Sequence, residues 1–393
     1  MSEWDICQAS SGLKLALGLD LYREARFEVP VDTVRLVERL GYHSVWTAEA
    51  YGSDALSPLA YLAALTTRIG LGTAVVQIAA RTPAATAMHA MTIDALARQS
   101  GGDLESPSRV IIGIGVSGPQ IVEGWYGSPW GVPHQRLREY VAIMRSIFAR
   151  DPLTNDGPEY PLPYLGPGST GQGKPLRSIL HPGPGIGIWI AAGGPINTAL
   201  TAEVADGFLP MGWGSTGLAD ASPALERGFA ARSAPTPRQS FEIFSGCQVK
   251  ITDDVGATLD AMRPLTAMYV GGMGSATHNY HRAAMARRGY ADAADRIQEL
   301  WLAGRKAEAA AAVPDEYLDD GGLYGSVTRI RDRWEPWTRR GLTGLTIRSE
   351  QADALELMAD LAGTRDAAEP TAVSRGAAEP TAVSRDDRDD QDG

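Results

Sequence analysis

The stretch from Arg109 to Gly127, which reads RVIIGIGVSGPQIVEGWYG, holds the residue types best suited to ligand binding in this 393-residue chain. The apolar run at its start is rich in β-branched side chains and predicts a strand buried on both faces of a parallel sheet. The glycines and proline that follow predict a turn whose backbone a ligand can approach closely. Gln120 and Glu123 give this turn a polar rim, and Trp125 and Tyr126 suit the wall of a wet cavity. We therefore expect a ligand site at the C-terminal end of this strand.

Three glycines in the turn, Gly113, Gly115 and Gly118, fit the G-x-G-x-x-G pattern of dinucleotide-binding proteins. Two observations weaken this interpretation. A dinucleotide-binding unit usually opens its domain, whereas three strand–helix units precede this turn. The acidic residue expected about 20 residues further on would be Glu139, which lies in a helical pattern at 135–148. A turn that only links strand to helix is a further alternative, so the glycines alone do not identify a ligand.

The elements around this turn recur as strand–helix units. Ser57-Pro58 and Thr82-Pro83 each predict a helix start, because an N-cap residue is followed by proline in the first turn. Repeated strand–helix units imply right-handed crossovers and a parallel sheet. The predicted strands are 13–21, 43–48, 69–76, a strand from 109, 186–191, 207–210, 241–251 and 342–347. Eight strands close a barrel, so we predict an α/β fold, a (β/α)8 TIM barrel with insertions.

Composition divides the chain into a barrel, from 13 to 363, and two terminal segments. Residues 1–12 are expected to form a loose arm, and 364–393, which repeats AAEPTAVSR, lacks the large apolar residues of a core and is expected to be disordered. Within the barrel, 151–185 contains eight prolines and seven glycines and predicts a long loop, whereas 254–332 is mostly helical in pattern. Long loops in compact domains are often lids or binding loops.

Charge and cysteine content exclude several classes of function. The formal net charge is −11, and the basic surface that non-specific nucleic-acid binding requires is therefore not expected. Two cysteines, Cys7 and Cys247, form neither a disulfide framework nor a zinc site, which fits a reducing compartment. The sequence has no signal-peptide pattern and no apolar run long enough to span a bilayer. We therefore expect a soluble cytoplasmic protein without a membrane or nucleic-acid partner.

Four stretches together resemble the luciferase-like family of flavin and deazaflavin oxidoreductases, and within it the branch that uses coenzyme F-420. These stretches, with the shorter YVGGMG at 269–274, cover most of residues 13–348. They are VWTAEAYGSDALSPLAYLAALT, RIGLGTAVVQIAARTPAATAMHAMTIDAL, VIIGIGVSGPQIVEGWYG and IWIAAGGPINTALTAEVADGFLP. The resemblance implies a (β/α)8 barrel that binds the ring system at the C-terminal mouth. It also favours a homodimer, the state in which relatives often occur.

The resemblance assigns roles at the ends of several strands. It places a non-prolyl cis peptide at Ala74–Val75, behind the ring, and the coenzyme's side chain and phosphate between the turn at 117–120 and the loop at 191–194. The residues expected to bind the cofactor are Asp20, Ala74, Val75, Ser117, Gly118, Pro119, Gln120, Glu123, Ala192, Gly193 and Gly194.

Glu49 and His278 are the candidates for catalysis. Glu49 matches an acidic position near the ring, and a carboxyl group buried in an apolar mouth can handle a proton. A structural carboxylate that accepts hydrogen bonds from loop amides is the alternative for Glu49. His278 and His281 are candidates for an acid or a substrate contact, or are packed or solvent-exposed histidines of the helical segment. Many relatives carry histidine where this chain has Ala50, which argues against an acid at that position.

Other charged residues have structural alternatives. Gly271–Gly274 is a candidate for holding the coenzyme's anionic tail near Arg282, Arg287 and Arg288, although these arginines also suit a solvated helix face. Asp206, at the start of a predicted strand, suits a capping or structural role. Residues 97–108 are longer than in relatives and are expected to lie at the end of the barrel opposite the site.

The expected activity is hydride transfer between F-420 and a small organic substrate. The deazaflavin itself accepts or donates the hydride, so the protein needs only to bind and orient the two partners. No metal site is expected. Two alternatives remain: an FMN-dependent luciferase-like monooxygenase, and a catalytically silent barrel that only binds a flavin. We expect the loop at 151–185 and the helical segment at 254–332 to determine the substrate.

Overall fold

The computed structural model describes residues 12–23, 26–101, 105–211, 218, 220–273, 279–338 and 341–365. The expected N-terminal arm up to residue 11, Cys7, Gly274, His278 and the repeat tail from residue 366 lie outside the described residues.

Eight parallel strands close into a barrel, which confirms the predicted fold. In barrel order they are β1 (Lys14–Gly18), β4 (Ser44–Thr47), β5 (Gly70–Thr73), β7 (Val110–Gly115), β8 (Gly187–Ala192), β9 (Gly207–Pro210), β10 (Glu242–Ile251) and β12 (Gly344–Arg348). The pairing of β12 with β1, through Leu345 and Leu15, closes the ring. The strand ends therefore form two faces, and in barrels of this kind ligands bind at the C-terminal face.

Strand β7 shows why these apolar runs form barrel strands. Ile112 and Ile114 are fully buried in the layer between the strands and the helices. Ile111 points the other way and packs against the cluster inside the barrel. A strand covered on both faces requires apolar side chains at successive positions, which explains the absence of alternation in the sequence.

Three aromatic rings fill the inside of the barrel, and each lies over a glycine of a neighbouring strand. A Cβ atom at any of these glycines would come closer than 3.0 Å to ring atoms. The pairs are Trp46 with Gly72, Trp189 with Gly207, and Phe244 with Gly344. The three rings also contact one another, with centroids 5.1–6.2 Å apart. Large rings and absent side chains thus complement each other to give a packed interior.

The barrel helices lie outside the strands and return the chain to the opposite face. They are α2 (Val31–Arg39), α3 (Leu56–Ala63), α4 (Pro83–Gly101), α5 (Pro119–Gly124), α6 (Pro133–Phe148), α7 (Pro195–Val204), α8 (Ser222–Ala230), α14 (Val327–Asp332), α15 (Trp334–Thr338) and α16 (Ala352–Ala362). Along α6 the buried residues Leu137, Val141 and Met144 recur at helical spacing and face the strands.

Two predicted helix starts have different outcomes. The Thr82 hydroxyl accepts the Ala85 N–H, and α4 begins at Pro83 as expected. Ser57 is instead inside α3, which begins at Leu56, and the Asp54 carboxylate accepts the first N–H groups of that helix. The Ser57 prediction is wrong because an acidic residue three positions earlier caps the helix more effectively.

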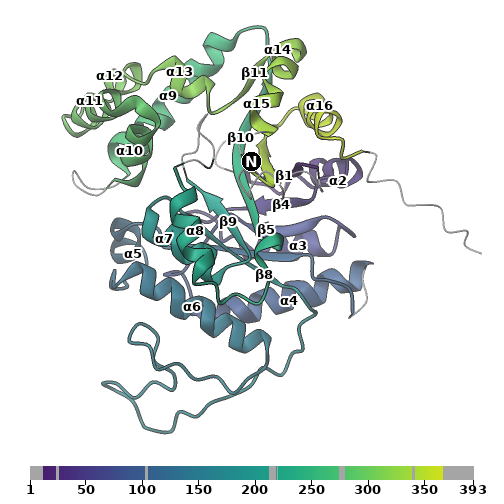
Figure 1. Cartoon of the computed structure of the whole chain (residues 1–393), viewed down its shortest axis with the longest axis vertical. Helices are drawn as coiled ribbons and strands as arrows, with labels where there is room; N and C mark the ends of the chain where they lie inside the picture. The colour runs from purple at the N-terminus through teal and green to yellow at the C-terminus, as the bar shows by residue number, and fades with distance from the viewer. Residues whose placement is uncertain are drawn as a thin grey trace, which may run out of the picture.

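The segment after β10 forms a second helical body, which Figure 1 shows above the barrel. Its helices are α9 (Val255–Gly272), α10 (Tyr280–Met285), a π-type turn at Ala286–Tyr290, α11 (Ala291–Leu302), α12 (Lys306–Ala311) and α13 (Asp315–Asp319). Buried side chains such as Leu259, Ile297 and Leu318 form a core of their own. Strand β11 (Gly322–Gly325), which the sequence did not reveal, then extends the sheet beside the C-terminal half of β10.

The loop at 151–185 lies outside the barrel helices, in teal at the bottom of Figure 1. The Glu139 carboxylate on α6 accepts the Tyr160 N–H, and the Asp94 carboxylate on α4 accepts the Gly183 N–H. That the loop shapes the substrate site stays a prediction, because its Glu159 carboxylate also accepts the Val132 N–H at the start of α6, the end nearer the mouth. The loop joins the end of α6 to the start of β8, and such connections begin and end at the face opposite the mouth.

Smaller elements complete the description. β2 (Tyr22–Arg23) and β3 (Arg26–Phe27) form a hairpin between β1 and α2, and a 3-10 turn at Arg238–Ser240 precedes β10. Of the extra residues at 97–108, those up to Gly101 extend α4, and 105–108 precede the N-terminal end of β7, as expected. Among the described helices, none is long and apolar enough to cross a membrane.

Candidate functional site

The C-terminal ends of neighbouring strands bring most of the predicted site residues to one face. Asp20 follows β1, Glu49 follows β4, Ala74–Val75 follows β5, the turn at 117–120 follows β7, and 192–194 ends β8. These strands are consecutive around the barrel. The predicted residues on them therefore share the mouth, whereas His278 is outside the described residues.

The peptide bond between Ala74 and Val75 is cis, as the resemblance implied. It separates β5 from the short strand β6 (Val76–Gln77), which pairs with β7 through Val76 and Ile114. Ala74 and Val75 pack on the aromatic cluster inside the barrel. They therefore lie at the top of the barrel's interior.

Gly113 and Gly115 lie inside β7 rather than in a turn. A Cβ atom at Gly113 would come closer than 3.0 Å to the Thr73 carbonyl oxygen, and one at Gly115 would do so to the Val75 side chain. The two glycines therefore make room for the neighbouring strand at its break. This corrects both the interpretation as a ligand-binding glycine turn and the dinucleotide pattern at these two positions.

The turn itself begins after Gly115 and contains a strained residue. Ser117 has φ = 60°, in the left-handed region that non-glycine residues seldom adopt. Gly118 follows as the N-cap of α5, and a Cβ atom there would approach only the Gln120 side chain within 4 Å. Backbone strain of this kind concentrates at ligand sites, where the surrounding structure maintains it.

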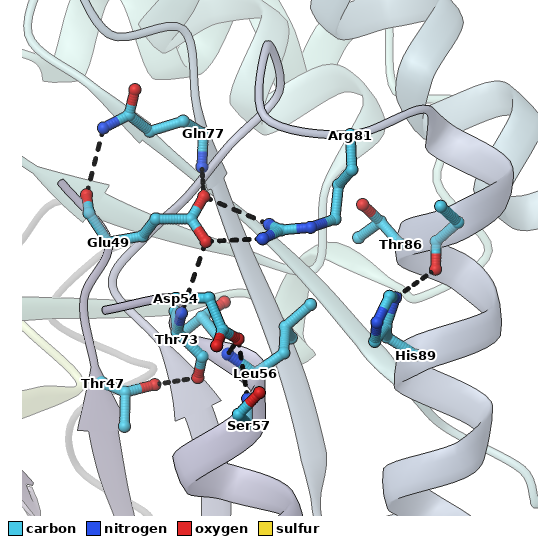
Figure 2. A network of polar contacts seen from close by, with 12 residues as sticks. Thr47, Glu49, Asp54, Leu56, Ser57, Thr73, Gln77, Arg81, Thr86 and His89 are labelled. Carbon is cyan, nitrogen blue, oxygen red and sulfur yellow. Dashed lines mark hydrogen bonds and ion pairs between the residues drawn. The ribbon is translucent and has the colours of Figure 1, made fainter. Parts of the chain in front are cut away.

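Glu49 lies at the centre of a polar network at the mouth (Figure 2). Its carboxylate accepts two hydrogen bonds from Arg81, of 3.1 and 2.7 Å, and one each from the backbone N–H groups of Ala55 and Gln77, of 3.3 and 3.1 Å. The Glu49 side chain is only 3% exposed. Both oxygens are thus occupied by donors, which is the geometry of the structural alternative for this residue.

Burial and the negative charge of Glu49 shift the pKa values of two neighbouring side chains, Arg81 and Tyr126. Burial works against the charge on Arg81, but its hydrogen bonds to Glu49 and the charge of Glu49 outweigh it, so the Arg81 pKa is raised. Burial raises the pKa of the Tyr126 phenol, and the negative charge of Glu49 adds to this effect. The network therefore keeps Arg81 charged and Tyr126 protonated beside the mouth.

Gln77 connects the network to the end of β6. Its side-chain Nε2 donates to the Glu49 carbonyl oxygen over 3.1 Å, and its backbone N–H donates to the Glu49 carboxylate. Its Oε1 is buried and, within the described part of the chain, has no hydrogen-bond partner. Figure 2 shows this oxygen pointing away from Glu49. An acceptor in this position can receive a hydrogen bond from a ligand.

Aromatic side chains border the mouth. Tyr51 and Trp125 are 55% and 62% exposed and contact each other in a tilted arrangement with centroids 6.3 Å apart. Tyr126, beside Trp125, is half-buried near Glu49. Trp125 and Tyr126 thus lie beside Tyr51, from the loop after β4, at the edge of the mouth, and their role as a cavity wall stays a prediction.

The loop after β8 meets the helical segment. Gly194 is the N-cap of the ten-residue helix α7, and a Cβ atom there would have open space around it. The Arg287 guanidinium donates to the Gly193 carbonyl oxygen over 2.9 Å. The helical segment thus reaches the mouth through Arg287. The uncapped start of α7 exposes N–H groups of the kind that bind phosphate.

The remaining residues of the helical segment have structural partners. Gly271 and Gly272 end α9, where a Cβ atom on either would come closer than 3.0 Å to Trp301, so they permit helix packing. Arg282 pairs with Asp295, and Arg288 with Asp320. This arrangement corrects the hypothesis that the glycines hold an anionic tail beside these two arginines.

His281, like the glycines, is part of this packing. Its ring lies 4.7 Å from that of Tyr269, and burial lowers its pKa. Of the two candidate histidines, His281 therefore matches the packed alternative. Among the described residues, no three His, Cys, Asp or Glu side chains group as metal ligands.

Sequence reasoning missed Gln77, Arg81 and Tyr51. Gln77 had a recognisable signal, since it is a polar residue in the otherwise apolar run AVVQI, two positions after Val75. Arg81 had none, because its link to Glu49 depends on how the chain turns after β6. Tyr51 lies in an irregular loop whose course the sequence pattern does not predict.

Comparisons with known proteins agree with this architecture. A family model described as luciferase-like monooxygenase matches residues 14–344. A Mycobacterium tuberculosis protein whose name assigns it to the coenzyme F-420-dependent oxidoreductases is 41% identical over 353 residues, which cover 89% of this chain and 99% of that protein. The match thus extends over the barrel and the helical segment together.

Two solved structures share the fold at low sequence identity. The F-420-dependent tetrahydromethanopterin reductase of Methanopyrus kandleri is 19% identical with a TM-score of 0.66, over 89% of this chain and 98% of that one. The oxygenating constituent of 3,6-diketocamphane monooxygenase from Pseudomonas putida, in complex with FMN, is 16% identical with a TM-score of 0.59, over 89% and 98%. The same barrel therefore occurs in an F-420-dependent protein and in an FMN complex.

Proposed function

The chain belongs to the luciferase-like monooxygenase family, and we propose that it is an oxidoreductase that binds coenzyme F-420 at the mouth of the barrel. The observation that carries this proposal is the 41% identity, over nearly the whole of both chains, with a protein described as F-420-dependent. The resemblance noted in the sequence pointed to the same coenzyme.

The residues at the mouth fit such a coenzyme. A flat apolar ring requires an apolar surface, which Ala74 and Val75 provide on top of the aromatic cluster. A phosphate group binds to hydrogen-bond donors that have no other acceptor. The N-terminus of α7 at Gly194 offers such donors, because no side chain caps its backbone N–H groups. The strained turn at Ser117 lies between these two places on the neighbouring strand.

When bound, the deazaflavin supplies hydride transfer, and the protein supplies orientation, charge placement and exclusion of water. We assign the ring surface to Ala74 and Val75. The other coenzyme contacts in the proposal are Asp20, Ser117, Gly118, Pro119, Gln120, Glu123, Ala192, Gly193 and Gly194. Tyr51 and Trp125 would then border the opening through which a small organic substrate enters.

Glu49 is a positioning residue in this proposal. Its carboxylate is engaged by Arg81 and by two backbone N–H groups, so a proton on either oxygen would displace a donor. It holds Gln77 and Arg81 in place at the mouth, where the Gln77 oxygen is left free to meet a ligand. The role of His278, which the structure does not describe, stays a prediction.

A titration of the purified protein with F-420 and, separately, with FMN tests the proposal, with coenzyme fluorescence as the readout. We expect F-420 to bind at least tenfold more tightly than FMN. A preference for FMN would contradict the proposal and favour the monooxygenase alternative, and binding of neither would contradict both.

Two matched variants locate the site in the same experiment. Ser117→Pro keeps the position small but is incompatible with the φ of 60°, and it should weaken F-420 binding. Arg150→Pro makes the same change at the other described non-glycine residue with positive φ, which ends α6, and should leave binding unchanged. The cytoplasmic location and the homodimer stay predictions, and analytical ultracentrifugation tests the second.

A further inference from the structure

Gln77 leaves a buried acceptor unused. The residue is 7% exposed, and its Oε1 is among the buried side-chain atoms without a hydrogen-bond partner in the described chain. A buried amide oxygen without a partner costs free energy unless something satisfies it, so such an atom requires an explanation. Its position next to the break in the strand suggests a ligand.

The orientation of the amide group is fixed by its neighbour. Nε2 lies 3.1 Å from the Glu49 carbonyl oxygen, which can only accept a hydrogen bond. A flipped amide would place two acceptors against each other, so the nitrogen must face Glu49 and the oxygen must be free. The free group is therefore an acceptor, and its ligand partner must be a donor.

The pleat of β6 determines which way Gln77 points. Val76 is fully buried in the layer between strands and helices, outside the barrel. Successive side chains of a strand point to opposite faces, so Gln77 points to the inner side. There its neighbours are Val75, which packs inside the barrel, and Gly115, its register partner on β7. The free oxygen thus lies on the inner side of the barrel, buried just beneath the surface of the mouth.

We propose that Gln77 Oε1 accepts a hydrogen bond from the imide N–H of the coenzyme's ring and so fixes the ring's orientation at the mouth. The oxidised deazaflavin carries this N–H between two ring carbonyl groups, and a flavin carries the same group. Gln77 is held for this role by two hydrogen bonds to Glu49, one from its backbone and one from its side chain. The proposal rests on the proposed function, since it requires a ring of this class at the mouth.

The test compares two probes, 5-deazariboflavin and its N3-methyl derivative, which differ only in the proposed donor. We expect the intact protein to bind the parent compound at least tenfold more tightly, as followed by quenching of probe fluorescence. Equal binding of the two probes would overturn the proposal, because a water molecule would then satisfy Gln77.

Variants separate a hydrogen bond from a steric effect of the methyl group. Gln77→Leu keeps the size of the side chain but removes the acceptor, together with the Nε2 donor to the Glu49 carbonyl oxygen, so it should bind the parent probe about tenfold more weakly and lose the preference between probes. Gln298→Leu makes the same change at another buried glutamine, on α11 in the helical segment, and should keep the preference. If Gln77→Leu retains the full preference, the proposal is wrong.

The outcomes also distinguish this proposal from the one on which it rests. Binding of F-420 without discrimination between the two probes leaves the function standing and removes Gln77 from it. Failure of the intact protein to bind both F-420 and the parent probe contradicts the function, and the assignment of Gln77 fails with it. The measurement on the intact protein stands on its own if Gln77→Leu does not fold.

Discussion

Two buried carboxylates at opposite ends of the barrel have nearly the same partners but different surroundings. Asp206, directly before β9, accepts hydrogen bonds from Arg145, from the Ile188 N–H and from the Thr236 hydroxyl, of 2.9, 2.8 and 2.8 Å. Glu49, after β4, likewise binds one arginine and two other donors. One network lies at the N-terminal face and the other at the mouth.

The difference lies in what surrounds each carboxylate. In the described structure, the side chains bonded to Asp206 leave no buried polar atom without a partner, whereas beside Glu49 the Gln77 oxygen is unpartnered. A buried carboxylate paired with an arginine therefore stabilises the fold at the closed end. At the mouth such a carboxylate also positions Gln77, whose side-chain oxygen is free to accept a hydrogen bond. Buried side-chain atoms without a partner also occur away from the mouth in the described chain, such as Glu242 Oε2 at the start of β10 and Asp94 Oδ1 on α4, so it is the position of the Gln77 oxygen at the mouth that points to a ligand.

The largest expected effect is on stability at the closed end. Asp206→Ala leaves Arg145 and the buried Ile188 N–H without their acceptor and should lower the free energy of unfolding by about 3 kcal/mol. Urea denaturation measures this loss. The affinity of the folded variant for F-420 should stay within about twofold of that of the unmodified protein. A larger change would contradict the view that Asp206 serves only the stability of the fold.

The next effect is on coenzyme binding at the mouth. Glu49→Gln places an amide nitrogen against Arg81 or against a backbone N–H, which disturbs Gln77, and should weaken F-420 binding about tenfold, or roughly 1.4 kcal/mol. Glu38→Gln is the matched control, because Glu38 accepts three backbone N–H groups at the start of β5, far from the mouth. Equal affinity in both variants would show that Glu49 has only a structural role.

The smallest effect, at about 1 kcal/mol for one unit of pH, is a pH dependence of stability at the closed end. Burial, together with the charge of Lys14, lowers the pKa of His43 to about 4, against the opposing effect of Glu242. Between pH 6.5 and 4 the unfolded chain therefore binds more protons, and stability falls by about 1 kcal/mol per pH unit as the pH is lowered. Above pH 6.5 this contribution is constant.

Chemical denaturation at pH 7.5, 6 and 5 measures the dependence on His43. His43→Gln should flatten the profile over this range, since glutamine does not titrate. F-420 affinity should follow pH equally in both proteins, because His43 precedes β4 and lies away from the mouth. An unchanged stability profile in the variant would contradict the assignment.

The barrel could be predicted because its signals are local and repeated. Apolar runs such as that of β7, and the Thr82-Pro83 helix start, recur along the chain and specify parallel strands without knowledge of tertiary contacts. The short strand β11 was missed, since the four residues of Gly322–Gly325 have no periodic pattern and depend on β10 for their pairing.

The site was predictable in place but not in detail. Glu49 was expected at the mouth because it ends a strand, yet its role depends on Arg81, 32 positions away. Gly113 and Gly115 were interpreted as a ligand-binding turn. They lie inside β7 instead, where the absence of a side chain makes room for the break in the neighbouring strand. Contacts between distant positions decide such roles, and sequence patterns describe only near neighbours.

A crystal structure of the protein with F-420 tests the central claim most directly. We expect the ring to lie on Ala74 and Val75, with its imide nitrogen about 2.9 Å from Gln77 Oε1. The phosphate should lie at the start of α7. A ring bound elsewhere, or a ring at the mouth with Gln77 Oε1 bonded only to water, would contradict the assignment of Gln77 as the hydrogen-bond partner of the ring.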